Sequence, residues 1–445
     1  MITIENAVPA NSGINFREPV SLHIRKGEQT AFVGRNGSGK SMLAKLALSH
    51  FPLREGKITY SFSPQPVYEN AKMISFRDVY GAVEQSYYLQ QRWNSQDREL
   101  SPLVTLSSGE LRKYQINKIL QSRPKILVID NPFIGLDAAS RVMLAEMLNN
   151  MALAGETQII LLLSKTDEIP DFITHIVPVE DMRCGIKIRR AEYRETPSVK
   201  PKIGVLEPPS PFVKINFFSS SREKDVLSEN VVVMKDITVR YGSRTILANL
   251  NWTVRRGERW ALLGPNGSGK STLLSIVCAD NPQSYACDVS LFGRRRGTGE
   301  SIWDIKRRIG YVSPEMHRAY YEDIPAIKIV ASGLYDSVGL YLQPKEEEYA
   351  VCEWWMNLFG VKNLKDRHFM QLSDGEQRLI LLARAFVKDP ELLILDEPMH
   401  GLDTQNRLKA GAIIESFCQN KNKTLIMVTH YEKELPESIT NQLVL

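Results

Sequence analysis

Short apolar runs in this chain alternate with stretches whose apolar positions recur at helical spacing. Two of the runs, 30–33 and 260–263, are each followed by a glycine-rich loop and then by a helical pattern, over 42–48 and 272–277. Strands of this length that alternate with helices indicate an α/β fold. The longest apolar runs, 159–163 and 379–383, are much shorter than the ~18 residues that a membrane-spanning helix needs.

The pattern occurs twice in the chain. Residues 25–41 reappear as 255–271, and the later blocks 106–112 and 125–137 reappear in the same order as 372–378 and 392–403. The leucine that opens the first of these later blocks lies 24 residues before the aspartate that ends the apolar run within the second block, in both halves (106 to 130, 372 to 396). Such a repeat predicts two copies of one domain. We expect domains over 1–190 and 229–445, joined by a linker over 191–228.

The linker differs in composition from both domains. Five prolines fall within 197–211, and 218–225 is rich in serine and charged residues, so an extended, partly polyproline segment is expected. Over 183–230 there are ten Lys or Arg against six Asp or Glu. This excess is typical of a solvated connector, and the alternative is a basic strap that contacts a partner.

Composition excludes several classes of protein. An apolar content of 43% with 24% charged residues argues against a disordered chain, and residues 1–30 lack the apolar segment of a signal peptide. The five cysteines form no C-x-x-C pair, which argues against a disulfide framework or a zinc site and fits a reducing cytosol. We therefore expect a cytoplasmic protein. The net charge of +5 permits contact with nucleic acid but does not indicate it.

Both glycine-rich loops have the spacing Gly-x4-Gly-Lys-Ser between a strand and a helix, which is the setting of a phosphate-binding P-loop. Backbone N–H groups and the helix N-terminus would face the phosphates, the lysine would neutralise them, and the serine would bind Mg²⁺. The sequence thus predicts two ATP sites. Their residues are Gly34, Asn36, Gly37, Ser38, Gly39, Lys40, Ser41 and Met42 in the first half, and Gly264, Asn266, Gly267, Ser268, Gly269, Lys270, Ser271 and Thr272 in the second.

An aspartate ends an apolar β run downstream of each P-loop. Asp130 and Asp396 occupy these positions, where a carboxylate can hold Mg²⁺ opposite Ser41 and Ser271. An aspartate at the end of a strand more often caps a helix or forms a turn. The P-loop upstream favours the metal role here.

P-loops alone do not separate GTPases, helicases and transport ATPases. The blocks Leu-Ser-x-Gly-Glu at 106–110 and 372–376 resemble the signature of the ATP-binding-cassette (ABC) family. A finer resemblance, to the ModF/PhrA type of molybdenum-transport ATP-binding or photorepair protein, is carried by 106–113 (LSSGELRK), 291–309 (LFGRRRGTGESIWDIKRRI) and 372–387 (LSDGEQRLILLARAFV).

The ABC resemblance implies that two cassettes pair head-to-tail, here within one chain that would be a monomer. Each ATP would lie between the P-loop of one cassette and the signature of the other. The implied signature residues are Ser107, Ser108, Gly109 and Glu110 in the first half, and Ser373, Asp374, Gly375 and Glu376 in the second. The implied D-loop aspartates are Asp137 and Asp403.

The two halves differ at the positions that perform hydrolysis. In the second half the resemblance makes Glu397 the general base, His430 the switch histidine that reaches the γ-phosphate, and Tyr241 the aromatic that stacks on adenine. The same offsets in the first half fall on other residues, which are Asn131, Ser164 and Asn11.

An amide cannot take a proton, so we expect the first ATP to be held and the second to be hydrolysed. The active site would then combine the second P-loop with the first signature, and the inert site the first P-loop with the second signature. The alternative is drift in a first half that is retained only for packing.

Several features depart from the ABC pattern. The glutamine that links the active site to a partner is not evident, because Ser313, Pro314 and Glu315 follow the corresponding apolar run. The P-loop and signature are 72 residues apart in the first half (34 to 106) and 108 in the second (264 to 372), so we expect a smaller first helical subdomain. The first glycine of each signature is replaced, by Ser108 and Asp374.

Two functions remain open at this point. The chain could be the energising subunit of a membrane transporter, for molybdate as the subgroup's description implies, bound to permease subunits at the inner face of the cell membrane. It could instead be a soluble switch that acts on nucleic acid, the ribosome or another protein. The run 294–296 of three arginines could contact phosphates, although a solvated loop is the simpler interpretation.

Overall fold

The structure is a computed structural model of the chain. It describes residues 2–10, 16–62, 66–75, 108–133, 136, 138–164, 169–194, 201, 203–204, 206, 228–241, 244–318, 320 and 322–445. Contacts divide the chain into two compact units. The first unit comprises Met1–Tyr87, Ser95–Ser198 and Gly401–Gln405, and the second comprises Tyr88–Asn94, Val199–His400 and Asn406–Leu445.

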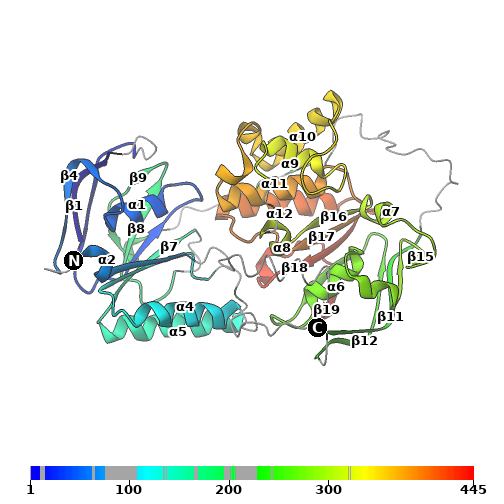
Figure 1. Cartoon of the computed structure of the whole chain (residues 1–445), viewed down its shortest axis with the longest axis horizontal. Coiled ribbons are helices and arrows are strands. Elements are labelled where there is room, and N and C mark those ends of the chain that lie inside the picture. The colour runs from blue at the N-terminus through cyan, green and yellow to red at the C-terminus, as the bar shows by residue number, and fades with distance from the viewer. Residues whose placement is uncertain are drawn as a thin grey trace. The chain divides into compact units, whose positions relative to one another are not determined.

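The described residues of the first unit form two sheets (Figure 1). The smaller is antiparallel with the order β2-β1-β4, from β1 (Ile2–Pro9), β2 (Val20–Ile24) and β4 (Leu53–Tyr60). The larger has the order β10-β8-β3-β7-β6-β5, with β9 beside β8. Its strands are β3 (Thr30–Val33), β5 (Ala71–Ser75), β6 (Ile126–Asp130), β7 (Gln158–Leu163), β8 (His175–Glu180), β9 (Arg183–Cys184) and β10 (Ile188–Arg189). The helices are α1 (Lys40–Ala47), α2 (Val67–Asn70), α4 (Ser108–Leu120) and α5 (Ala138–Ala154).

The second unit is built in the same way. Its antiparallel sheet has the order β12-β11-β14-β15, from β11 (Asn230–Tyr241), β12 (Arg244–Arg255), β14 (Asp288–Leu291) and β15 (Arg294–Arg295). Its parallel sheet has the order β16-β17-β18-β13-β19, from β13 (Arg259–Leu263), β16 (Ile309–Val312), β17 (Leu392–Asp396), β18 (Thr424–Val428) and β19 (Asn441–Val444). The helices are α6 (Lys270–Val277), α7 (Ile302–Lys306), α8 (Pro314–Arg318), α9 (Ala326–Ser332), α10 (Glu346–Phe359), α11 (Asp374–Phe386) and α12 (Thr404–Cys418).

The strand order repeats between the units. The parallel strands β5-β6-β7-β3-β8 of the first unit correspond in order and connection to β16-β17-β18-β13-β19 of the second. In each, the strand that precedes the glycine-rich loop lies between two parallel neighbours. The predicted α/β fold with duplicated cassettes is therefore confirmed at the level of topology.

Burial on both faces explains why the central strands are continuous apolar runs. In β6, Ile126 and Val128 pack into a core with the antiparallel sheet and α1, whereas Leu127 and Ile129 pack into a second core with α4 and α5. Successive side chains of a strand point to opposite faces, so the interior positions of such a strand are apolar on both sides. None of the helices within the described ranges is long and apolar enough to cross a bilayer.

A helical layer is added to the second unit between β16 and β17 (Figure 1). Helices α9, α10 and α11 pack on one another, and the fully buried ring of Trp355 in α10 lies 5.2 Å from that of Phe386 in α11. The corresponding segment of the first unit lies largely outside the described residues, so the expected smaller first subdomain stays a prediction.

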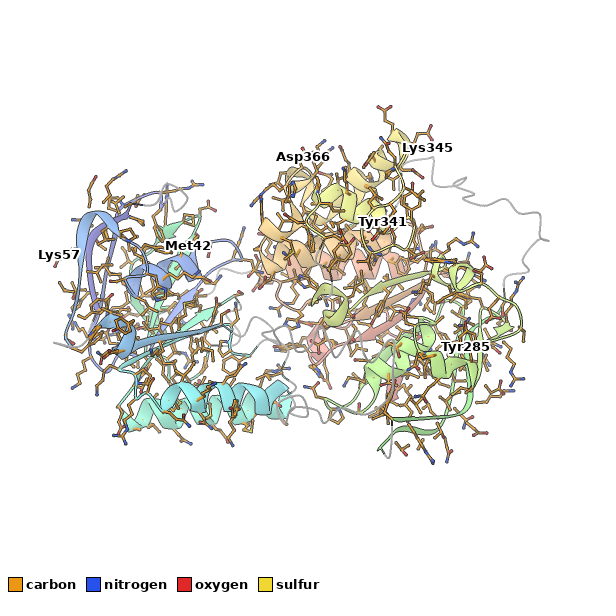
Figure 2. The ribbon with its side chains drawn as sticks, in the orientation of Figure 1. Met42, Lys57, Tyr285, Tyr341, Lys345 and Asp366 are labelled. Carbon is orange, nitrogen blue, oxygen red and sulfur yellow. The ribbon has the colours of Figure 1, made fainter. Side chains whose placement is uncertain are left out.

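The arginine run at 294–296 is not a single patch. Arg294 and Arg295 form the exposed strand β15. Arg296 is buried, where its guanidinium pairs with Glu300 at 2.7 Å and lies 4.5 Å from the ring centroid of Tyr285, a residue labelled in Figure 2. A guanidinium held in this way serves packing within the second unit and is not presented to a phosphate.

The aromatic core of the helical layer gives a test of stability. Trp355 is 2% exposed, so Trp355→Ala should lower the free energy of unfolding of the second unit by about 3–5 kcal/mol, through lost burial and the cavity left behind. Trp303, which is 55% exposed, provides the matched control, and Trp303→Ala should change this free energy by less than about 0.5 kcal/mol. Denaturant titration followed by circular dichroism measures both, and equal effects would contradict the described packing.

Candidate nucleotide site

The two glycine-rich loops have the same backbone conformation at their second and third glycines. Gly37 and Gly267 have φ of 75° and 79°, and Gly39 and Gly269 have φ of 103° and 102°, a left-handed region that side chains disfavour. Gly39 and Gly269 are also the N-caps of α1 and α6. Backbone N–H groups at the start of each helix are thereby directed toward the loop, as an anion requires.

Glycine is also required where each loop begins. A Cβ at Gly34 would collide with the carbonyl oxygen of Val179 at the end of β8. A Cβ at Gly264 would lie 2.6 Å from the carbonyl oxygen of Leu445, which follows β19. Each loop is therefore packed against the carboxyl end of the neighbouring parallel strand.

The P-loop lysines are buried inside their own loops. Nζ of Lys40 donates to the carbonyl oxygens of Gly34 and Arg35 at 2.8 and 2.7 Å, and Nζ of Lys270 donates to those of Gly264 and Pro265 at 2.8 and 2.6 Å. Burial lowers the pKa of Lys40 to about 8, although the nearby carboxylate of Asp130 acts in the opposite direction. The loop thus holds an ammonium group with little water around it, which strengthens its attraction for a phosphate.

Two buried hydroxyls fit a phosphate ligand. The Oγ atoms of Ser38 and Ser268 are buried and have no hydrogen-bond partner among the described residues. A buried polar atom without a partner costs about 1–3 kcal/mol, and equivalent positions in both loops carry this cost. A phosphate oxygen in the loop would give each hydroxyl an acceptor. The loops therefore fit the triphosphate that their sequence predicts.

The serine and aspartate predicted to hold Mg²⁺ meet in the first unit. Oγ of Ser41, at the start of α1, donates to Oδ2 of Asp130 at 2.9 Å, across 89 positions of sequence. In the second unit Ser271 lies in the first turn of α6 and Asp396 is buried at the end of β17. A hydroxyl and a carboxylate at this position are oxygen ligands of the kind Mg²⁺ prefers. The residues present therefore fit the ion. Met42 follows Ser41 on α1 (Figure 2) and is half-buried.

Glu397 follows Asp396 in the second unit and is held by two histidines. Oε1 lies 2.8 Å from Nε2 of His430, and Oε2 lies 3.3 Å from Nδ1 of His400. Burial alone would raise the pKa of Glu397, but the hydrogen bonds to His400 and His430 outweigh it and hold the pKa well below its usual range. The carboxyl group is therefore ionised at neutral pH.

The equivalent place in the first unit has the same backbone and different side chains. Asn131 has φ of 48° and Glu397 has φ of 47°, and their N–H groups donate at 2.9 Å to Leu162 and Val428, the equivalent carbonyls of β7 and β18. In place of the carboxylate and imidazole, Oγ of Ser164 donates to Oδ1 of Asn131 at 3.1 Å. The same hydroxyl also lies 2.9 Å from Oδ1 of Asn36 in the P-loop.

The second signature begins a well-capped helix. Oγ of Ser373 accepts from the N–H of Glu376, and the carboxylate of Glu376 accepts from the N–H of Ser373 at 2.8 Å, which together form a capping box at the start of α11. Asp374 and Gly375 occupy the first turn. In the first unit α4 begins at Ser108 and includes Gly109 and Glu110, and Ser107 lies outside the described residues.

A buried arginine of the second signature helix binds the loop that carries Glu397. Arg378 is 1% exposed, and it donates to the carbonyl oxygens of Asp396 at 2.8 Å, Glu397 at 2.5 Å and Pro398 at 3.3 Å. It also donates at 3.0 Å to the carbonyl of Ser313, which follows β16 where the family's glutamine was expected. Oγ of Ser313 accepts from the N–H of Met316, so this serine caps α8.

The remaining predicted residues are distributed as follows. Tyr241 ends β11 with 43% of its surface exposed, and its hydroxyl accepts a hydrogen bond from Asn281 at 3.0 Å, which leaves the ring accessible. Asp403 is buried. Asn11 and Asp137 lie outside the described residues, as does most of the linker.

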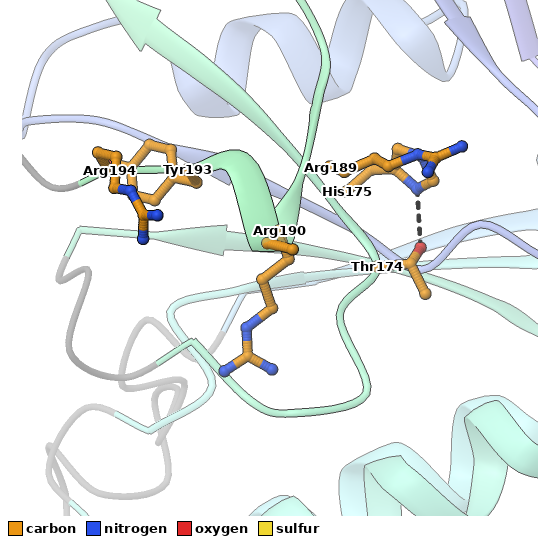
Figure 3. Close-up of a pocket in the computed structure, with 7 residues that line it drawn as sticks. Thr174, His175, Arg189, Arg190, Tyr193 and Arg194 are labelled. Atoms are coloured by element: carbon orange, nitrogen blue, oxygen red, sulfur yellow. Dashed lines mark hydrogen bonds between the residues drawn. The ribbon is translucent and has the colours of Figure 1, made fainter.

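Figure 3 shows a surface pocket of the first unit. Its lining includes His175, at the start of β8, and Arg190, whose guanidinium donates to Asp171 at 2.9 Å. His175 pairs with Thr30 at the beginning of β3, whereas the P-loop follows Val33 at the end of that strand. Parallel strands share one direction, so this pocket is at the opposite edge of the sheet from the nucleotide site.

Comparison with known proteins agrees with this geometry. The sequence profile of the family described as ABC transporter matches residues 17–99 and 247–400. The chain belongs to the ABC transporter family. It is a tandem ABC ATPase that binds ATP.

Relatives of this ABC protein include chains of similar length. The ABC transporter ATP-binding protein ModF of Escherichia coli (strain K12) is 36% identical over 468 residues, which cover 95% of this chain and 92% of that protein. An uncharacterised ABC transporter ATP-binding protein of Schizosaccharomyces pombe is 28% identical, with 95% and 93% covered. A solved ATP-binding cassette of an ABC transporter in its ADP conformation has a TM-score of 0.40, 19% identity, and coverage of 49% of this chain and 88% of that one.

Two residues of the site were missed by sequence reasoning. His400 lies four positions after Asp396, and a lone histidine at such a position carries no local signal. Arg378 belongs to the repeated signature block, but its spacing alone does not show that it reaches the end of β17. Only the contacts across the sheet of this ABC cassette identify both.

The lowered pKa of Lys40 predicts a pH dependence for ATP binding at the first P-loop. Only the ammonium form attracts phosphate, so affinity should be constant below pH about 8 and should fall by up to about tenfold per pH unit above it. Titration of the Lys270→Ala variant with a fluorescent ATP analogue from pH 6.5 to 9.5 measures this. The same titration after Lys40→Ala should be weak and flat, and a flat curve with Lys40 intact would contradict the prediction.

Proposed function

We propose that this ABC ATPase hydrolyses ATP at one nucleotide site and holds ATP at the other. The observation that carries the proposal is the contrast between the Glu397–His430 pair and the Asn131–Ser164 pair on matching backbones. A carboxylate can accept a proton from an attacking water, whereas an amide cannot. The binding groups of both P-loops are present in both halves.

At the competent site each residue would have a distinct task. The N–H groups of the second P-loop and the Lys270 ammonium bind the phosphates, and Tyr241 stacks on adenine. Ser271 and Asp396 would hold Mg²⁺, which supplies neutralisation of the β- and γ-phosphate charge. Glu397 orients the attacking water and takes its proton, and His430 holds that carboxylate and reaches the γ-phosphate.

At the inert site, uncharged side chains occupy the positions of the base and of the switch histidine. The hydroxyl of Ser164 shares its one proton between the side-chain oxygens of Asn131 and Asn36, so a hydrogen-bonded hydroxyl replaces the imidazole. Lys40, Ser41 and Asp130 can still bind the phosphates and Mg²⁺. Loss of the general base alone lowers the rate of hydrolysis about 10²–10⁴-fold. ATP held there would favour the paired state of the cassettes without being consumed.

The family resemblance supports a composite arrangement of the two sites. In it the second P-loop works with the first signature, Ser107–Glu110, and the first P-loop works with the second signature, Ser373–Glu376. Asp137 and Asp403 would serve as the D-loop aspartates. The cassettes would pair within the chain when ATP is bound and would part after hydrolysis beside Glu397.

The relatives favour a role as the ATP-binding subunit of a transporter. Their descriptions name ABC transporters, and the sequence resemblance to the ModF/PhrA type extends this to molybdate as cargo, with permease subunits as partners. One observation favours the second candidate, a switch that acts on nucleic acid, the ribosome or another protein. Ser313 occupies the place of the partner-sensing glutamine, and its carbonyl and hydroxyl are both bonded within the cassette.

The asymmetry predicts unequal effects of two matched substitutions. Glu397→Gln should lower the turnover number for ATP about 10²–10⁴-fold, because the base is lost. Asn131→Ala, at the equivalent backbone position, should change turnover by less than about twofold. Steady-state release of phosphate from the full chain measures both. Equal losses from the two substitutions would refute the division of labour.

Trapping the ATP-bound state separates the two candidate roles. The Glu397→Gln chain should bind ATP without hydrolysing it and so retain its partner during affinity capture from cells. Recovery of membrane permease subunits with ATP, and their loss after Lys270→Ala, supports the transport role. Recovery of nucleic acid or ribosomes under the same conditions supports the switch and contradicts the transport role.

A further inference from the structure

We propose that His400 is a positioning residue for hydrolysis, which holds the carboxylate of Glu397 from the side opposite to His430. The inference rests on the proposed role of Glu397 as the base. Nδ1 of His400 lies 3.3 Å from Oε2, and Nε2 of His430 lies 2.8 Å from Oε1, so each carboxylate oxygen has its own imidazole.

The backbone around Glu397 is fixed as firmly as its side chain. Its N–H donates to Val428 at 2.9 Å, and its carbonyl oxygen accepts from the N–H of His400 at 3.0 Å and from Arg378 at 2.5 Å. The residue also has a φ of 47°, which a non-glycine residue adopts only where its surroundings enforce it. Rotation about the side-chain bonds is then the main freedom left to the carboxylate.

His400 limits that remaining freedom. With one imidazole, the carboxylate could turn about the Oε1 contact and carry Oε2 away from the position of the water. With two, both oxygens are located, and each keeps a lone pair for a water. Displacement of a base by about 1 Å can lower the reaction rate about 10²-fold. A group that prevents this displacement therefore contributes to turnover without contacting ATP.

The position of His400 makes it specific to the competent half. It lies four residues after Asp396, and the same offset from Asp130 falls on Ile134. Isoleucine has no polar side-chain atom, so the first half lacks the base, the switch histidine and this donor together. His400 also precedes Gly401, which has a φ of 76°, so the turn that places its ring ends at a glycine.

Steady-state kinetics of the full chain with Mg-ATP tests the inference. His400→Ala should lower kcat about tenfold and leave KM for ATP within about twofold, because the residue does not contact nucleotide. His400→Gln, which keeps a donor near Oε2, should recover kcat to within about threefold of wild type. His368, which pairs with Asp323 at 3.5 Å in the helical layer, provides the control, and His368→Ala should leave kcat unchanged.

A second background separates positioning from general damage. In Glu397→Gln, whose residual rate is followed with radiolabelled ATP, adding His400→Ala should cause no further loss, since the residue acts through the carboxylate. A tenfold loss in that background too, or wild-type kcat for His400→Ala, overturns the inference and leaves the proposed function intact. Wild-type turnover in Glu397→Gln itself overturns the proposed function, and the inference with it.

Discussion

The close approach of a glycine-rich loop to the end of the neighbouring strand is the constraint on which the site depends. Gly34 meets the carbonyl of Val179, and Gly264 meets that of Leu445, at a distance that leaves no room for a side chain. This packing places each P-loop at the carboxyl edge of a parallel sheet. At that edge the strands of the repeat also end in Asp130 and Asp396, so the groups predicted to bind phosphate and Mg²⁺ meet there.

At the backbone position shared by Asn131 and Glu397 the two halves differ only in their side chains. The N–H bonds and the positive φ that place Glu397 also place Asn131, so the fold supplies both halves with a position suited to a base. The second half fills it with a carboxylate held by imidazoles, and the first with an amide held by a hydroxyl. Conserving the backbone while changing two side chains preserves the binding groups, because those are provided mainly by the loop itself.

In the second unit helix α11 is hydrogen-bonded directly to the backbone that carries Glu397. Arg378 is buried and satisfied by the carbonyls of Asp396, Glu397 and Pro398, and also by that of Ser313. A buried guanidinium is tolerated only where its donors are bonded in this way. Helix α11 therefore cannot shift against the end of β17 without breaking several charge-assisted hydrogen bonds.

Much of this protein was determined by local sequence. The strand, loop and helix of each P-loop, the aspartates at strand ends and the exchange of Glu397 for Asn131 all follow from short patterns and equal spacings, because each is governed by backbone preferences within a few residues. The equal separation of 34 residues (130 to 164, 396 to 430) even paired Ser164 with His430. The second imidazole on Glu397 and the contacts of Arg378 with the end of β17 were decided only by tertiary structure. They depend on which strands are neighbours in the sheet and on where a turn places a side chain. Neither the spacing of residues nor the hydrophobic periodicity encodes those facts.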